Sequence, residues 1–475
     1  MKSMKVAIIG AGASGLVTAK YLSQAKQYFG VPEIEIRIFE REKSIGGVYR
    51  HKVYEDAEMV SSKYLTAFSD FRVAKELPDF LPMEEYVRYL EAYCTKFGLW
   101  DLIETQTEII QVLRLTQGNH RVFYKRHVDR RSGGDNEPRP EELSWDCDAV
   151  AICSGLNNIP SIPAIEGLEN VSSVLHSSEV KSGRQFGKNT SVMILGAGET
   201  AMDLAHLAVT SNAREVVMCH KDGFYCAKKK EATSKVLRPD LLVLATGYVR
   251  RFIFLGEGYP KPDDLNIRGI WRRGDVTAGF IGFVRPGIGA IPPLAELQAQ
   301  LWVFNLLRHK YQQQIPSPSE YADSVAHYEI DYALKARGGH DFFKTKHGVE
   351  QESYAYQLAL DMGAAPTFTF MRRQGFKAFL TWAMGSNFNS KFRLVGPWKW
   401  EKGALDIMRG ELFDVVKQTG GGVFFTTYTL LPIIVLGVLT IVLHMIAGVL
   451  RLMGMEERAK VVLGSGNVPR REGDD

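Results

Sequence analysis

The sequence contains few cysteines, and none of them are paired. The five cysteines are Cys94, Cys147, Cys153, Cys219 and Cys226, and no two are spaced as CxxC. A disulfide framework, a thioredoxin-like redox pair and a zinc site each need cysteines at matched or short spacing. The sequence therefore predicts a reducing compartment and no metal site, and it disfavours a disulfide reductase.

The chain also lacks a strong excess of charge of either sign. Its 58 basic and 54 acidic residues give a formal net charge of +4, and no basic stripe is interleaved with aromatic residues. Nucleic-acid binding needs such a stripe, so we expect no nucleic-acid partner. The N-terminus enters an apolar strand at once, which leaves no room for a secretory signal. The 475 residues are enough for two or three domains.

One long stretch near the C-terminus has no charged residue. Residues 418–450 contain no Asp, Glu, Lys or Arg, and Leu430–Leu450 is apolar almost throughout. About 20 apolar residues are enough to cross the hydrocarbon core of a bilayer. A core helix rarely stays apolar on every face over that length. We therefore expect a transmembrane anchor over residues 424–450, with a buried core helix as the alternative.

Glycines are plentiful, and the first cluster follows an apolar strand. The stretch "KVAIIGAGASGLVTAKYL" (Lys5–Leu22) has the order strand, glycine turn, helix, with Gly10, Gly12 and Gly15 in the turn. In that order, Gly10 permits the tight turn, Gly12 lets a pyrophosphate approach, and Gly15 lets the helix pack on the strand. Free N–H groups at the helix start then favour phosphates. The motif predicts a dinucleotide site rather than an ordinary glycine turn.

A carboxylate ends the next predicted strand. The strand "IEIRIFE" ends in Glu40, thirty residues after Gly10. A carboxylate there can accept hydrogen bonds from both hydroxyls of an adenosine ribose. Gly46 and Gly47 follow, where the pyrophosphate and ribityl chain of a flavin would pass, although a plain turn would also explain them. Together these residues predict an FAD site.

The same pattern occurs a second time. In "SVMILGAGETAMDLAHLA" the strand is followed by Gly196, Gly198 and Ala201 at the three fingerprint positions. The next strand, "EVVMC", ends in His220 and Lys221 instead of an acid. A basic pair favours a 2′-phosphate, whereas an acid would repel it, so the motif predicts NADPH rather than NADH. The alternative for Lys221 is a solvated lysine on a loop.

Two further segments, "DAVAICSG" and "DLLVLATG", are similar to each other and are suited to carry the chain between domains. The predicted fold is therefore α/β, with two Rossmann-like domains, the NADPH domain being inserted in the FAD domain. The predicted boundaries are 1–180 for the first part of the FAD domain, 181–238 for a shortened NADPH domain, and 239–420 for the second FAD part with the substrate pocket.

These motifs resemble those of the flavin-containing monooxygenases, including their Baeyer–Villiger relatives, over nearly the whole chain. The motifs that carry the resemblance are "GAGASG", "SIGGVY", "SSKYLTAFSDF", "GAGETAMD", "LATGY", "GFIGFVRPGIGAIPPLAELQA" and "FRLVGPW". The amino-acid sequences of several of these motifs are most similar to those of fungal members. The resemblance implies FAD and NADPH as cofactors, and O2 with a small organic molecule as substrates. By resemblance only, Ser62, Thr246 and Gln298 lie near the flavin; an ordinary polar residue on a helix surface is the alternative for Gln298.

The resemblance also implies the reaction and the location. The substrate would be oxygenated at nitrogen or sulfur, or as a ketone in the Baeyer–Villiger manner, through a C4a-hydroperoxyflavin, in secondary-metabolite biosynthesis. No catalytic triad or metal is required for this chemistry, and the sequence identifies no catalytic side chain. The apolar tail would hold the protein in the endoplasmic reticulum membrane with the catalytic domain in the cytosol.

The sequence departs from this family at three places. The family's linker motif aligns with residues 170–180 and keeps only His176, and Val60 stands where many relatives have an active-site asparagine. These two departures raise the alternative of an uncoupled NADPH oxidase. The third departure is that only 50 residues separate Gly196 from Thr246, whereas the resemblance implies a much longer interval.

Because this interval is short, we expect the second domain to lack part of its sheet in the sequence as given, and two interpretations follow. Two strands and one helix would leave its helix-facing surfaces poorly covered. Either the domain is a genuine remnant or the sequence derives from a gene model that lost an exon. We favour the lost exon, because an intact fingerprint would be odd in a domain that no longer folds. A non-catalytic FAD-binding membrane protein is the further alternative.

Overall fold

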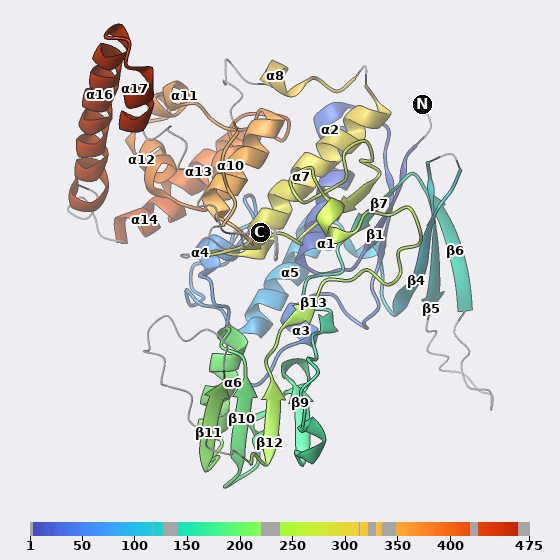
Figure 1. Cartoon of the computed structure of the whole chain (residues 1–475). Helices are drawn as coiled ribbons and strands as arrows, with labels where there is room; N and C mark the ends of the chain where they lie inside the picture. The colour runs from blue at the N-terminus through green and yellow to red at the C-terminus, as the bar shows by residue number, and fades with distance from the viewer. Residues whose placement is uncertain are drawn as a thin grey trace. The chain divides into compact units, whose positions relative to one another are not determined.

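The computed structural model describes residues 3–116, 118–126, 141–219, 238–312, 314–321, 329–334, 348–418 and 426–463. The chain forms two compact units, one of residues 1–373 with 386–406, the other of residues 374–385 with 407–475. The first unit contains two separate parallel sheets (Figure 1).

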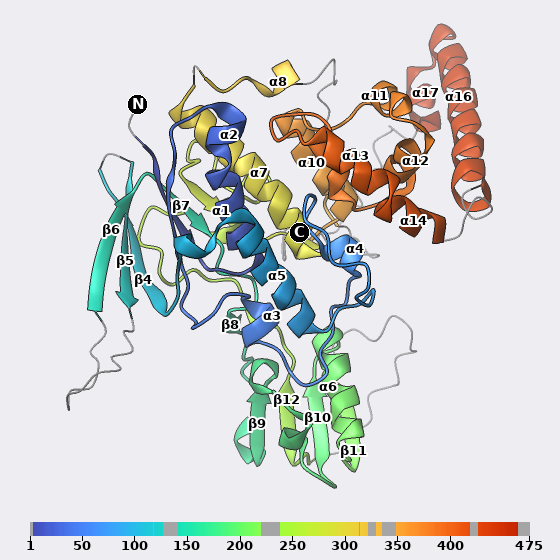
Figure 2. The same ribbon diagram turned by 180° about the vertical axis from the view of Figure 1, so that it is seen from behind.

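The first parallel sheet has five strands in the order β14-β7-β1-β2-β3. Its strands are β1 (Lys5–Ile9), β2 (Glu35–Phe39), β3 (Ile103–Glu104), β7 (Ala149–Ile152) and β14 (Ala278–Phe280). Three helices accompany it, namely α1 (Ala13–Ser23), α5 (Met83–Phe97) and α7 (Ile291–Lys310). An antiparallel sheet of β4 (Thr107–Arg114), β5 (His120–Arg126) and β6 (Glu141–Cys147) lies beside it (Figure 2).

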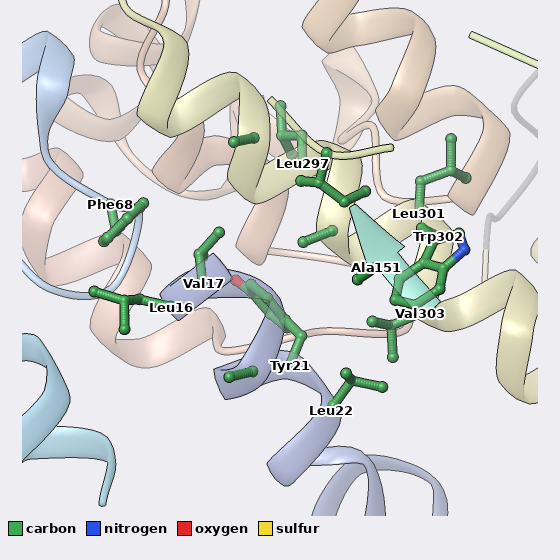
Figure 3. Packing of buried hydrophobic residues seen from close by; sticks show 14 of the residues in the cluster. Leu16, Val17, Tyr21, Leu22, Phe68, Ala151, Leu297, Leu301, Trp302 and Val303 are labelled. Atoms are coloured by element: carbon green, nitrogen blue, oxygen red, sulfur yellow. The ribbon is translucent and has the colours of Figure 1, made fainter. Parts of the chain in front are cut away.

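The two faces of this sheet are buried against different partners. Along β1, Val6 and Ile8 belong to the core shared with α1 and α7, whereas Ala7 and Ile9 belong to the core shared with the antiparallel sheet. This alternation follows from the two-residue period of a strand. Figure 3 shows side chains of α1 and α7 meeting in the first of these cores, with Trp302 fully buried.

The second parallel sheet has four strands in the order β11-β10-β12-β9. They are β9 (Ser173–His176), β10 (Ser191–Leu195), β11 (Glu215–Cys219) and β12 (Leu241–Leu244), and helix α6 (Glu199–Thr210) packs on them. The expectation of only two strands in this domain is therefore wrong. Strands β9 and β12, which lie outside the predicted 181–238 segment, complete the sheet through parallel pairing.

The two parallel sheets repeat one arrangement. The order β2-β1-β7-β14 in the first corresponds to β11-β10-β12-β9 in the second. The Asp148 side chain accepts a hydrogen bond from the backbone N–H of Lys5 at 2.8 Å, and Asp240 accepts one from Ser191 at 2.7 Å. The segments "DAVAICSG" and "DLLVLATG" are therefore equivalent sheet strands, as well as connections between domains.

A buried ionic cluster joins segments that are far apart in sequence. Asp70 lies 2.6 Å from Lys20 and 2.7 Å from Arg393, and all three are almost fully buried. Glu296 accepts hydrogen bonds from Tyr21 at 2.8 Å and from the backbone N–H of Ser69 at 2.8 Å. The cluster thus links α1 and α7 to the blocks "SSKYLTAFSDF" and "FRLVGPW".

Shorter elements complete the first unit. The helices are α2 (Ala25–Phe29), α3 (Val48–His51), α4 (Lys63–Thr66), α8 (Pro318–Tyr321), α10 (Gln351–Met362) and α11 (Phe368–Arg373), and α13 (Glu401–Arg409) begins here and ends in the second unit. The short strands are β8 (Ile159–Pro160), β13 (Tyr248–Val249), β15 (Arg285–Pro286) and β16 (Gly348–Val349).

The second unit is helical and contains the apolar stretch. Its helices are α12 (Phe376–Met384), α14 (Glu411–Gln418), α16 (Leu431–Leu452) and α17 (Glu456–Val462). By length and composition, α16 can cross a membrane, with a mean hydropathy of 2.7 over its most apolar window. Only 6% of that window is buried within the protein, so α16 is not the buried core helix that was the alternative.

Candidate functional site

A cavity of about 340 Å³ lies at the carboxyl ends of the first parallel sheet. Ligands bind outside the carboxyl ends of such strands, because the connecting loops diverge there. The residues that follow β1, β2, β7 and β14 all contribute to its lining, namely Gly10 and Gly12, Glu40, Ser154, and Gly282. Five of the predicted cofactor residues meet in this one cavity: Gly10, Gly12, Glu40, Gly46 and Gly47.

The first glycine turn has no room for side chains at Gly10 and Gly15. Gly10 has φ +105°, and a Cβ there would lie 2.7 Å from the carbonyl oxygen of Cys153. A Cβ on Gly15 would lie 1.9 Å from the carbonyl oxygen of Gly10, so α1 packs tightly on the turn. Gly12 begins α1 as its N-cap, with no side-chain cap and no acidic residue in the first turn. This leaves the positive end of the helix dipole available to an anion.

The glycine pair after β2 lies against that turn. Gly46 and Gly47 have φ +117° and +54°, and a Cβ on Gly47 would lie 3.2 Å from the Cα of Gly12. The N–H of Gly46 donates to the carbonyl oxygen of Ala11 at 3.1 Å. Glycine is the residue that tolerates such backbone angles. The pair therefore forms one wall of the cavity next to the helix start.

Glu40 is held by backbone groups at the cavity edge. Its carboxylate accepts hydrogen bonds from the N–H of Ala11 at 2.7 Å and of Glu42 at 2.9 Å, and the residue is only 7% exposed. A carboxylate offers about four lone-pair positions, so two bonds leave capacity for ligand hydroxyls. The orientation of Glu40 is thus set by the strand end and the glycine turn.

Several lining residues were not singled out from the sequence. Arg41, Lys52 and Arg251 bring positive charge to the cavity wall, and Glu42 and Glu108 bring negative charge, with Arg41 lying 3.2 Å from Glu42. The three positive residues carry no recognisable spacing, because they come from three separate loops. Ser154 and Gly282 had a usable signal, since each follows an apolar strand at the sheet edge where a ligand is expected.

The three residues placed by resemblance alone do not line this cavity. Ser62 is the N-cap of α4, and Thr246 donates to the carbonyl oxygen of Ser161 at 2.5 Å. Gln298 is fully buried, so the alternative of a helix-surface residue is wrong. Its side chain accepts from the N–H of Gly282 at 2.8 Å and donates to the Tyr354 hydroxyl at 2.8 Å. Gln298 therefore holds a lining residue in place from behind.

The second sheet repeats the glycine turn. Gly196 has φ +133°, and a Cβ there would lie 2.3 Å from the carbonyl oxygen of Ala245, whereas Gly198 has open space around it. Gly198 is the N-cap of α6, with no side-chain cap, and Ala201 is buried in the core beneath. This uncapped helix start can receive a pyrophosphate as the first one can, although α6, unlike α1, has an acidic residue, Glu199, in its first turn. The predicted 2′-phosphate residues, His220 and Lys221, lie outside the described residues.

His176, the last residue of β9, is hydrogen-bonded to the segment that follows β12. Its Nδ1 accepts from the backbone N–H of Ser178 at 3.2 Å, so Nε2 carries the proton and donates to the carbonyl oxygen of Gly247 at 3.0 Å. Burial lowers the pKa of His176, which keeps the ring neutral at physiological pH. This is a satisfied structural histidine, in contact with the "LATGY" segment.

Comparison with known proteins points to one family. The family described as flavin-binding monooxygenase-like matches residues 3–235 and 227–451. The chain is 35% identical to Monooxygenase cfoE of Aspergillus candidus over 93% of this chain and 98% of that protein. It is 34% identical to Monooxygenase ptmN of Penicillium ochrochloron over 93% and 94%.

Solved structures are similar in fold. The structure of S-allyl-L-cysteine S-oxygenase from Allium sativum matches with a TM-score of 0.57 and 21% identity, over 87% of this chain and 99% of that one. The crystal structure of Tmm from Pelagibacter sp. strain HTCC7211 matches with a TM-score of 0.53 and 20% identity, over 68% and 82%. At these identities the similarity concerns the fold.

The same comparisons bear on the short interval between the glycine turn and "LATGY". The alignment with cfoE runs over 591 positions, but this chain has 475 residues, so at least the difference of 116 positions has no counterpart here. The two family matches overlap at residues 227–235, between β11 and β12. The first match therefore ends, and the second begins, within the 50 residues that separate Gly196 from Thr246.

Proposed function

This chain belongs to the flavin-binding monooxygenase-like family, and we propose that it oxygenates a small organic substrate at the expense of NADPH and O2. As a member of that family it is an NADPH-dependent flavin monooxygenase with FAD and NADPH as its cofactors. The observation that carries the proposal is the cavity at the edge of the first sheet, which is lined by the turn of Gly10 and Gly12 at the uncapped start of α1, by the pair Gly46 and Gly47, and by Glu40.

The lining residues fit FAD at the first sheet. The turn at Gly10 and Gly12 and the start of α1 suit the pyrophosphate, and Glu40 suits the adenosine ribose. Gly46 and Gly47 leave room for a chain to pass over the turn. When bound, FAD supplies the redox and oxygen chemistry, and the protein contributes binding, orientation and exclusion of water.

NADPH is proposed to bind at the turn of Gly196 and Gly198. Its pyrophosphate would lie at the start of α6, which has no side-chain cap. We propose His220 and Lys221 as partners of the 2′-phosphate, because a positive pair after the second strand favours that group. Ser62 and Thr246 remain candidates for contacts near the flavin, and Gln298 acts through Gly282.

The substrate is proposed to be an apolar amine, sulfide or ketone in a biosynthetic pathway of secondary metabolites. Similarity to two fungal monooxygenases over most of both chains supports this class. Helix α16 is proposed as a membrane anchor that places the catalytic unit at the cytosolic face of the endoplasmic reticulum. Its length and exposed apolar surface support the anchor.

An anaerobic titration of the purified, FAD-loaded protein tests the proposal. NADPH should abolish the oxidised-flavin absorbance, and NADH should act much more slowly. If FAD is bound and neither nucleotide reduces it, the protein is not the proposed enzyme as it stands, and its transcript should be sequenced between the codons of Val216 and Tyr248. If NADPH reduces the flavin but every equivalent appears as hydrogen peroxide with all substrates, the protein is an uncoupled oxidase.

A further inference from the structure

A short segment contacts both nucleotide-binding sheets. Residues 51–55, here called the strap, run on from the last residue of helix α3, His51. His51 and Lys52 line the cavity of the first sheet, whereas Tyr54 and Glu55 bond to residues of the second sheet's domain. Figure 2 shows the chain leaving α3 and reaching the second sheet beside α6. The proposed function does not assign any role to the strap.

The ends of the strap are fixed by hydrogen bonds. The Glu55 carboxylate accepts from the N–H of Gly183 at 2.9 Å and from the hydroxyl of Ser182 at 3.0 Å. The N–H of Glu55 donates to the carbonyl oxygen of Lys181 at 2.9 Å. In return, the Lys181 ammonium donates to the carbonyl oxygen of His51 at 3.1 Å. Each domain thus holds the backbone of the other.

Between these bonds, Tyr54 reaches the helix that begins at the second glycine turn. Its ring packs against the hydrophobic core of the second sheet, and its hydroxyl donates to the Asp203 carboxylate at 2.5 Å. Burial and the bond to Asp203 raise the pKa of Tyr54 well above its ordinary value, so the hydroxyl keeps the proton it donates. Asp203 lies on α6, about 6 Å along the helix axis from its first residue, Glu199.

We propose that Tyr54 is a positioning residue for hydride transfer from NADPH to FAD. This inference rests on the proposed function. In the step, a hydride leaves NADPH, giving NADP⁺, and is accepted with one solvent proton by oxidised FAD. The two reacting atoms must lie about 3 to 3.5 Å apart, and a misplacement of about 1 Å can cost about a hundredfold in rate. The strap ties the start of α6 to the FAD cavity, so it sets that separation.

The test compares Tyr54→Phe and Tyr54→Ala with the wild-type full chain. Stopped-flow reduction by NADPH without oxygen gives a limiting rate and a Kd for NADPH, and the FAD content is measured by absorbance. We expect the limiting rate to fall about threefold in Tyr54→Phe, which loses the hydroxyl, and about tenfold in Tyr54→Ala, which loses the ring as well. FAD content should stay unchanged and the Kd should change less than about twofold.

Substitutions of Asp203, the hydrogen-bond partner of Tyr54, separate a positioning role from a general loss of structure. Asp203→Leu should match Tyr54→Phe, and the two together should be no slower than either alone, because both remove the same bond. Asp203→Asn keeps an acceptor and should retain most of the rate. Tyr311→Phe is the matched control. It lies just past the end of α7, about 30 Å along the helix from Ile291 in the cavity lining, and its buried hydroxyl has no hydrogen-bond partner among the described residues.

The outcomes distinguish this inference from the proposed function. A wild-type flavin that NADPH does not reduce contradicts the proposed function itself. A wild-type flavin that is reduced, with Tyr54→Phe and Asp203→Leu at the wild-type limiting rate, overturns only the role of Tyr54. Loss of FAD in these variants, or a slowing equal to that in Tyr311→Phe, also overturns it, because the effect would then be structural.

Discussion

At the scale of single residues, the cavity depends on glycines, which have no Cβ atom. Gly10 combines a backbone angle that other residues rarely adopt with close contact to the carbonyl oxygen of Cys153. Gly15 has no such angle, but its Cα lies against Gly10. The first glycine therefore shapes the turn, and the third lets the helix approach it, as the spacing predicts.

Gly10→Ala should destabilise the protein and prevent FAD binding. The substitution adds strain at φ +105° and a contact of 2.7 Å with Cys153, for which we expect a loss of about 3 kcal/mol in the free energy of unfolding. Urea unfolding and the FAD content of purified protein measure both effects. Gly98→Ala is the control, because Gly98 has φ +63° with open space around it and should cost only about 1 kcal/mol. Equal effects of the two substitutions would contradict the argument.

The sequence predicts glycine positions better than it predicts the partners of polar residues. A glycine fingerprint is local, since strand, turn and helix are contiguous and the steric need arises within the motif. The role of Gln298 depends on Gly282 and Tyr354, which lie on other elements. The positive residues of the cavity could not be predicted either, because they come from separate loops. Tertiary contacts of this kind leave no period or spacing in the sequence.

At the scale of elements, the buried ionic cluster explains two motifs that have no direct part in the cavity. Asp70 from "SSKYLTAFSDF" pairs both with Lys20 of α1 and with Arg393 from "FRLVGPW". Burial opposes ionisation, but the charges of Lys20 and Arg393 lower the pKa of Asp70 to about 2. The folded-state pKa lies below the ordinary value, so this contribution to stability is present above about pH 4 and is lost as the pH falls towards 2.

Asp70→Asn should therefore destabilise the protein in a pH-dependent way. Two buried cations would lose their shared counter-charge, which typically costs about 3 to 5 kcal/mol. The difference from wild type in urea unfolding should be largest near pH 6 and should shrink as the pH falls below 4. Asp146→Asn is the control, since Asp146 pairs with Arg121 on the surface and should cost less than about 1 kcal/mol. A difference that does not depend on pH would count against an ionised Asp70.

At the scale of the whole molecule, the proposed membrane location rests on α16. Leu439 lies near the middle of this helix, and Met453 lies just past its end. Arginine at the centre of a spanning helix costs about 2.5 to 3.5 kcal/mol on insertion scales, whereas a charge at the end can reach the interface. Leu439→Arg should shift the protein from the carbonate-washed membrane pellet to the supernatant, and Met453→Arg should not. Retention of Leu439→Arg in the pellet would argue against a spanning helix.

The architecture was predictable only in part. The two fingerprints predict two nucleotide-binding units and the family, because these motifs are local and specific. The four strands of the second sheet were not predicted, since β12 pairs with β10 and β9 pairs with β12, and the paired residues Ser173 and Leu241 lie 68 positions apart in the chain. Parallel strands have no connecting turn that would reveal their partner. The short interval suggested a deficient domain, yet among the described residues β11, β10, β12 and β9 pair in parallel to form a four-stranded sheet.

The way β10 lies between β11 and β12 has an evolutionary consequence. Each neighbour pairs in parallel with β10 in its own register, so neither pairing is defined by a tight turn between Cys219 and Leu241. Doubling the length of a flexible connection costs only about 0.6 kcal/mol in closure entropy. Descendants of one ancestral gene can therefore gain or shed a large segment at this point while inheriting the same nucleotide-binding scaffold.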